Sequence, residues 1–237
     1  MSTRSHVLLF LFGLYAGIFF SCKQDAGTNA DESVTGSQKT EKSKPLKKKT
    51  TLKPADSIDN RNTIPFLEQY GELNQETKVR IKTRLGNIDI QLYEDTPLHR
   101  ASFIFLTKVG YFDTTCFYRV VPGFIIQGGE SERLDTQKFK ARYWRYRIPP
   151  EFRENRKHKY GAVAMARDWE NNPGKRSTAF EFYIVQSRDG AHHLDGEHTV
   201  IGEVVSGFET VDRIVSLEAG SDEWPLEDVF MKVDILD

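Results

Sequence analysis

Four groups of residues carry side chains capable of chemistry, and three of them lack the neighbours that the chemistry needs. Cys116 lies in a strand-like apolar run, which is typical of a small buried residue and not of a thiol nucleophile. His192, His193 and His198 match no metal-ligand spacing, so we expect no metal site. The run 174–177 lacks the upstream glycine and strand of a phosphate-binding loop. The fourth group surrounds Arg119.

Arg119 stands in the stretch 117–129, FYRVVPGFIIQGG, in which Phe124 and Gln127 follow it and two glycines end the run. An arginine taken alone is most simply a surface ion-pair partner. Its guanidinium is also always charged, planar and rich in donors, so an arginine held in a fixed place is a strong hydrogen-bond donor. The elements that position the stretch decide between these two interpretations.

Short strand-like runs dominate the chain after residue 77. Alternating apolar residues predict a hairpin over 79–92, and Pro97 begins a helix that Gly110 ends. Further runs predict strands at 117–121, 124–127, 161–166, 180–185, 199–204 and 229–236, and a second helix at 208–215. Many short strands with one helix near each end predict an all-β fold that closes into a barrel.

The first sixty residues have the composition of an export signal and a tether. The apolar run Val7–Phe20 would span about 21 Å as a helix, less than the ~30 Å bilayer core, which predicts a signal peptide over 1–21. Ser21–Cys22 is similar to a bacterial lipoprotein cleavage box. We therefore expect Cys22 to be lipidated and the protein to be exported, facing the periplasm from the outer or the inner membrane. Residues 22–60 predict a disordered linker, and 61–76 a lead-in of one or two helical turns.

The charge balance of the chain bears on its partners. The 237 residues include 33 Lys and Arg against 34 Asp and Glu, a net charge of −1. This balance argues against nucleic-acid binding, which goes with a strongly basic face. The absence of heptads in the sequence makes a monomer the default expectation.

The stretch 117–129 resembles the core motif of the cyclophilins, the peptidyl-prolyl cis-trans isomerases, in which an Arg, a Phe and a Gln precede two glycines in this order. Further blocks follow in the family's order at 148–152, 161–167, 182–185 and 194–202. The resemblance covers residues 77–237. It implies a mainly β fold, a closed eight-stranded antiparallel barrel capped by two α-helices, and an isomerase that needs no cofactor.

The resemblance also implies a role for each matching residue. Isomerising an X-Pro bond crosses a barrier of about 18–20 kcal/mol, because the amide nitrogen shares its lone pair with the carbonyl. Twisting the bond localises that lone pair on nitrogen, so a fixed donor binds the transition state more strongly than the ground state. By resemblance Arg119 is that donor, Gln127 helps to position it, and Phe124 completes the catalytic group.

A set of substrate-binding residues follows from the same resemblance. Those that would hold the proline ring are Phe124, Ile125, Tyr183 and Leu194, with His198 at the rim. Those whose backbone would bind the residue before proline are Ala166 and Arg167.

Three positions depart from the family pattern. Glu181 stands where a Gln is usual, and a carboxylate there could pair with Arg119 or Arg167 and slow turnover. Tyr183 replaces a Phe and adds a hydroxyl to the pocket wall. His193 replaces the tryptophan of cyclosporin-sensitive members, so we expect weak cyclosporin binding.

Two functions remain open from the sequence. The first is a prolyl isomerase that acts on proline-containing exported or unfolded proteins. The second is a catalytically weak, chaperone-like module that binds proline peptides on the same fold. Glu181 and an expected Arg- and aromatic-rich loop at 133–147 keep the second function open. That loop would either select clients or pack onto the barrel.

Overall fold

The computed structural model describes residues 58, 59 and 61–236. The predicted signal peptide, Cys22 and all of the predicted linker except residues 58 and 59 lie outside this range. Within it, no helix combines the length and apolar character needed to cross a membrane.

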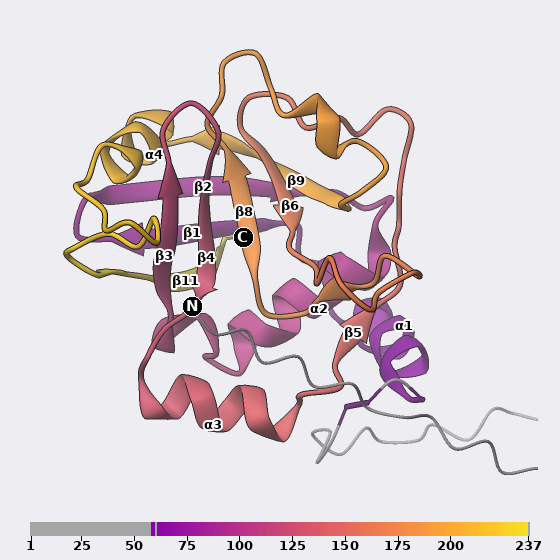
Figure 1. Cartoon of the computed structure of the whole chain (residues 1–237). Helices are drawn as coiled ribbons and strands as arrows, with labels where there is room; N and C mark the ends of the chain where they lie inside the picture. The colour runs from indigo at the N-terminus through magenta and orange to yellow at the C-terminus, as the bar shows by residue number, and fades with distance from the viewer. Residues whose placement is uncertain (1–57, 60, 237) are drawn as a thin grey trace, which may run out of the picture. The chain divides into compact units, whose positions relative to one another are not determined.

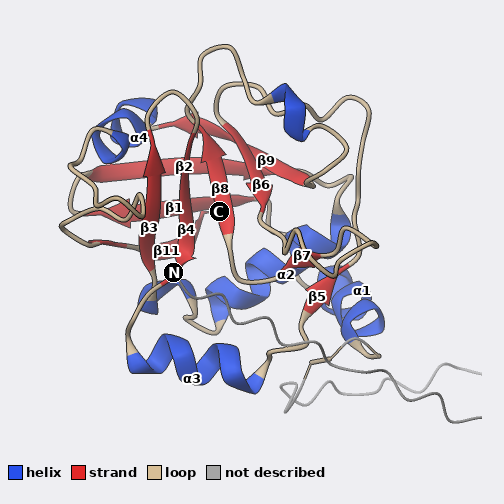
Figure 2. Ribbon diagram, viewed as in Figure 1, coloured by secondary structure: helices blue, strands red, loops and turns tan. Residues whose placement is uncertain are grey.

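One antiparallel sheet of nine strands forms the body of the domain (Figure 1). Its order is β10-β3-β4-β8-β6-β9-β2-β1-β11. The strands are β1 Lys78–Thr83, β2 Gly86–Leu92, β3 Cys116–Val121, β4 Ile125–Glu130, β6 Ala162–Met165, β8 Phe182–Val185, β9 Val200–Ser206, β10 Val229–Phe230 and β11 Lys232–Leu236. A separate pair is formed by β5 Arg147–Ile148 and β7 Ser177–Thr178. In Figure 2 strands β3, β4 and β8 cross in front of β1 and β2.

The C-terminal segment joins the two edges of the sheet. Strands β10 and β11 are separated only by Met231, yet β10 pairs with β3 and β11 pairs with β1. Counted as one broken strand, they give the eight strands that the sequence analysis expected. The mainly β barrel is confirmed, and its joined edges leave little unpaired backbone.

Four α-helices lie in the described part of the chain, against two expected. Helices α2 Pro97–Lys108 and α4 Phe208–Val215 occupy the predicted places. Between them in the chain lie two short 3₁₀ turns, Phe112–Thr114 and His192–Leu194. The other two are α1 Thr63–Leu73 and α3 Leu134–Arg142. Helix α1 corrects the expected one- or two-turn lead-in, because Phe66 and Leu67 are buried in the main core.

Helix α3 replaces most of the loop expected at 133–147. Its sequence is rich in good helix formers, and Thr136 and Phe139 are among the residues that attach it to the barrel. The hydroxyl of Thr136, a buried residue, donates to the Thr114 carbonyl at 2.8 Å. Phe139 packs its ring against Tyr111 at 4.9 Å between centroids.

Strand alternation divides the apolar residues between two clusters. In β8, Phe182 and Ile184 belong to the main core, while Tyr183 and Val185 belong to a second, smaller cluster. Ile125 of β4 joins the smaller cluster, and its neighbour Ile126 joins the main core. Since successive side chains of a strand point to opposite faces, the smaller cluster lies on the other face of these strands.

Candidate active site

A cavity of about 300 Å³ brings together ten of the eleven residues that the sequence analysis placed at the site. They are Arg119, Phe124, Ile125, Gln127, Ala166, Arg167, Tyr183, His193, Leu194 and His198. The eleventh, Glu181, lines a different cavity. Trp169 also lines the first cavity and was not anticipated.

The apolar wall of the cavity is built by the turn between β3 and β4 and by the face of β8 that carries Tyr183, opposite the main core. Gly123 has a φ of +74°, which a residue without a side chain adopts at low cost and which sets the turn before Phe124. The Phe124 carbonyl accepts backbone N–H groups from Gln186 at 2.8 Å and Ser187 at 3.1 Å. Its ring stacks on His193 at 5.5 Å. The wall is therefore fixed by backbone hydrogen bonds behind it.

A buried polar chain supports the wall at Tyr183. The Tyr183 hydroxyl lies 3.0 Å from His158 Nε2, and His158 Nδ1 lies 2.8 Å from Asp195 Oδ1. Because Nδ1 faces a carboxylate, it carries the proton, and Nε2 accepts the Tyr183 O–H. Burial lowers the pKa of His158, with Asp195 opposing the shift, so the imidazole is neutral at pH 7. His158 was not anticipated from the sequence, because it lies in no local motif.

The rim of the cavity carries a second neutral imidazole. His198 is 7% exposed, and its Nδ1 donates to the Met165 carbonyl at 3.0 Å. Burial lowers the pKa of His198 to about 4. Trp169 packs edge-on to this ring at 5.2 Å, and its own face is covered by Arg167 at 4.1 Å. Trp169 is 63% exposed. Its role at the cavity could not be predicted from the sequence, where it is only an aromatic residue in a loop.

At the two residues expected to bind the substrate through their backbones, the backbone of Ala166 and the side chain of Arg167 have partners within the protein. The N–H of Ala166 donates to the Glu181 carbonyl and its C=O accepts from Thr178, both at 2.9 Å. Both backbone groups of Ala166 are therefore committed to the fold. The side chain of Arg167 is bound to Glu197. Its Nε donates to the Glu197 carbonyl at 2.8 Å, and a terminal nitrogen donates to Glu197 Oε2 at 2.7 Å.

Arg119 and Gln127 face each other across strands β3 and β4 but have different partners. Arg119 donates through Nε to Glu223 Oε2 at 2.5 Å, whereas Gln127 donates through Nε2 to the Tyr118 hydroxyl. Gln127 was expected to position Arg119, but Arg119 donates to Glu223, a residue 104 positions further along the chain.

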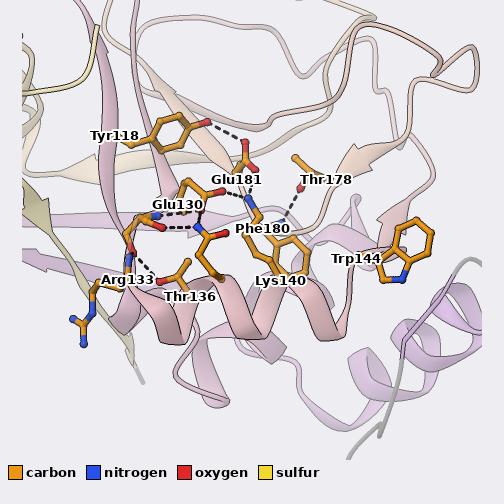
Figure 3. A network of polar contacts seen from close by, with 12 residues as sticks. Tyr118, Glu130, Arg133, Thr136, Lys140, Trp144, Thr178, Phe180 and Glu181 are labelled. Carbon is orange, nitrogen blue, oxygen red and sulfur yellow. Dashed lines mark hydrogen bonds and ion pairs between the residues drawn. The ribbon is translucent and has the colours of Figure 1, made fainter. Parts of the chain in front are cut away.

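The sequence left open a pairing of Glu181 with Arg119 or Arg167, and the structure gives Glu181 other partners. Glu181 accepts from the Tyr118 hydroxyl at 3.0 Å and pairs with Lys140 of α3 at 3.0 Å (Figure 3). Lys140 also pairs with Glu130. Lys140 could not be recognised as a partner from the sequence, because helix α3 was not predicted.

Neither a nucleophilic cysteine nor a metal site, both considered from the sequence, is found in the described part of the chain. Cys116 is fully buried, donates to the Glu130 carbonyl at 3.3 Å, and has its pKa raised to about 12 by burial. A thiol with that pKa is not a nucleophile at neutral pH. In the described part of the chain, no three His, Cys, Asp or Glu residues are grouped to hold a metal ion.

Comparisons with known proteins agree with this geometry. The model of the family described as cyclophilin type peptidyl-prolyl cis-trans isomerase/CLD matches residues 78–234. The chain is 32% identical over 165 residues to peptidyl-prolyl cis-trans isomerase-like 2 of Rhizopus delemar, covering 69% of this chain and 29% of that protein. It is 31% identical over 153 residues to the isomerase CYP18-1 of Arabidopsis thaliana, covering 64% of this chain and 90% of that protein.

A solved structure supports the fold. A cyclophilin type isomerase of Cryptosporidium parvum matches with a TM-score of 0.59 at 24% identity, over 68% of this chain and 98% of that one. At this identity the likeness concerns the fold alone.

Proposed function

The chain belongs to the cyclophilin-type peptidyl-prolyl cis-trans isomerase family, and on this premise we propose that it isomerises X-Pro bonds in exported or unfolded proteins. The observation that carries the proposal is the cavity itself. It combines an apolar wall suited to a proline ring with the guanidinium of Arg119, which Glu223 holds in place.

Arg119 acts as the donor to the proline nitrogen. Its Nε is occupied by Glu223, so the donors that remain for a peptide are those of the two terminal nitrogens. As the amide twists, the nitrogen lone pair becomes a better acceptor and the hydrogen bond strengthens. The step forms no covalent bond to the protein and moves no proton to it. About 3–4 kcal/mol of such stabilisation accelerates the reaction a few hundredfold.

The rest of the acceleration comes from the walls. Phe124, Ile125 and Leu194 hold the proline ring and keep water from the twisted amide. The neutral His198 places no charge beside the developing lone pair. Because the backbone of Ala166 is committed, we assign the contact with the residue before proline to the backbone of Arg167.

The test is a protease-coupled assay of an Ala-Pro-Phe peptide with the full-length chain. We expect Arg119→Ala to lower kcat/KM a few hundredfold, because the donor is lost. The matched control is Arg188→Ala, which removes an exposed arginine paired with Asp212 and should change kcat/KM less than twofold. An Arg119→Ala variant as active as the wild type would contradict the mechanism.

The second function, a catalytically weak module that binds proline peptides, loses one of its two supports. That support was a pairing of Glu181 with Arg119, and Glu181 instead contacts Lys140 and Tyr118. Glu181→Gln should therefore change kcat less than threefold. A tenfold gain would show that the carboxylate suppresses catalysis and would favour the binding module.

We further propose that the chain is an exported lipoprotein anchored through Cys22. The support is the run Val7–Phe20 followed by Ser21–Cys22. In a bacterial host supplied with a tagged fatty acid, the wild-type chain should be labelled and sediment with membranes. Cys22→Ala should lose the label. An unlabelled wild-type chain would contradict lipidation.

We also propose that cyclosporin binds weakly, because His193 occupies the place of the family's tryptophan. His193→Trp should strengthen cyclosporin binding in a fluorescence titration. Equal affinities for the variant and the wild type would contradict this assignment.

A further inference from the structure

The guanidinium of Arg119 is held by a segment that the proposed mechanism leaves without a role. We infer that Glu223 is a positioning residue that fixes the orientation of the Arg119 guanidinium for isomerisation, an inference that rests on the proposed function. Glu223 Oε2 accepts the Arg119 Nε–H at 2.5 Å. An acceptor on Nε sets the plane of the guanidinium and leaves its two terminal nitrogens for the peptide.

Glu223 is itself held in place by its backbone. Its carbonyl accepts the N–H of Val120, the residue that follows Arg119 in β3, at 2.9 Å. Its own N–H donates to the Gly220 carbonyl at 3.0 Å. Its φ of +66° lies in the left-handed region that residues with a side chain rarely adopt. Such a conformation persists where surrounding contacts enforce it, and here it carries the carboxylate next to the guanidinium.

The next residue attaches the segment on the other side of Arg119. The Trp224 ring packs on Tyr118, the residue before Arg119, with centroids 5.4 Å apart. Its indole N–H donates to Asp228 at 3.1 Å, and its carbonyl accepts the Gly220 N–H at 2.8 Å. Three successive residues of β3, Tyr118 to Val120, are therefore contacted by two successive residues of this segment.

The ion pair between Arg119 and Glu223 orients the guanidinium more than it stabilises the fold. The side chains of Arg119 and Glu223 are 32% and 43% exposed, and ion pairs in such surroundings add little to folding stability. A free arginine side chain samples many rotamers, so fixing it before the substrate binds lowers the cost of reaching the transition state. Gln127, directly across from Arg119, donates its amide N–H to the Tyr118 hydroxyl, whereas Glu223 accepts from Arg119 itself.

Positioning by Glu223 should raise kcat, whereas its negative charge should lower kcat, because the charge weakens the guanidinium of Arg119 as a hydrogen-bond donor. The amide variant separates the two effects, because Glu223→Gln keeps an acceptor oxygen and removes the charge. We expect Glu223→Ala to lower kcat about tenfold with KM within twofold of the wild type, and Glu223→Gln to keep at least half of the wild-type kcat. If charge were the dominant effect, both variants would be faster than the wild type, which would overturn the positioning role.

The experiment compares these variants in the full-length chain, with Glu227→Ala as the matched control. Glu227 lies in the same segment and pairs with Arg84 at 3.0 Å, away from the cavity. The second readout is the solvent exchange rate of the Arg119 Nε–H, measured by NMR. It should be slow in the wild type and in Glu223→Gln, and faster by an order of magnitude in Glu223→Ala.

The outcomes separate the inference from the function on which it rests. A wild-type chain that does not accelerate isomerisation refutes the proposed function and the positioning role together. An active wild type whose Glu223→Ala variant keeps full kcat refutes the positioning role alone. Loss of kcat with unchanged Nε–H exchange also refutes it, because the effect would then not pass through Arg119.

Discussion

Acid should destabilise the fold through the buried imidazole of His198 before it titrates the paired carboxylates. Burial places the pKa of His198 at about 4, against an unfolded value of about 6.5. Between these two pH values His198 is protonated in the unfolded chain and neutral in the folded chain. The free energy of unfolding therefore falls as the pH drops through 6.5 and stops falling below about 4.

The magnitude follows from the shift. The full difference is worth about 3 kcal/mol, of which about 2 kcal/mol is lost by pH 5. His158 acts in the same direction, because burial lowers its pKa too. Carboxyl groups with lowered pKa values, such as Asp195 and Glu197, lose their stabilising effect only at lower pH, since they are lowered from ordinary values of 3.8 and 4.5. The change in the free energy of unfolding between pH 6.5 and 5 thus reports His158 and His198.

The assay is urea unfolding of the full-length chain at pH 7.5, 6.5, 5.5 and 5.0. We expect the wild type to lose at least about 2 kcal/mol over this range, or about 4–8 °C in Tm. His198→Gln should flatten the dependence, and the control His193→Gln, which removes an exposed imidazole of the same cavity, should keep the wild-type slope. A stability independent of pH over this range would refute the reasoning, as would an unchanged slope in His198→Gln.

Three further substitutions test individual contacts. Tyr183→Phe leaves the buried Nε2 of His158 without its partner, so urea unfolding should show a loss of about 1–2 kcal/mol, and an unchanged stability would contradict the bond. Gly129→Ala would place a Cβ 2.1 Å from the Phe180 carbonyl oxygen at a φ of +98°, so the variant should be largely unfolded by circular dichroism, and a native spectrum would contradict the packing. Trp169→Ala removes an exposed ring from the cavity rim, so KM should rise about threefold with kcat unchanged, and an unaltered KM would exclude substrate contact.

Local sequence patterns account for much of the barrel and for the positions of its site residues. Alternation over 79–92 predicted the hairpin that the structure forms. The same period of two on β8 places Phe182 in the main core and Tyr183 in the smaller cluster on the opposite face. The motif at 117–129 supplied the order of Arg119, Phe124 and Gln127, which the hairpin of β3 and β4 brings into one cavity.

Contacts between distant segments could not be read in this way. Nothing near Glu223 indicates that it meets Arg119, because the contact depends on how the segment after α4 folds back onto β3. Helix α3 was missed because its few apolar residues give no strong helical stripe, and with it the partner of Glu181. Local patterns therefore gave the framework of the site, and long-range packing decided which carboxylate faces which cation.

The most direct measurement of the central proposal is NMR exchange between the cis and trans forms of an Ala-Pro-Phe peptide at equilibrium. A catalytic amount of full-length wild-type chain should raise the exchange rate well above the uncatalysed rate, and the same amount of Arg119→Ala should return it nearly to that rate. An uncatalysed rate with the wild type, while the peptide still binds in the cavity, would contradict the isomerase and leave a proline-peptide binding protein.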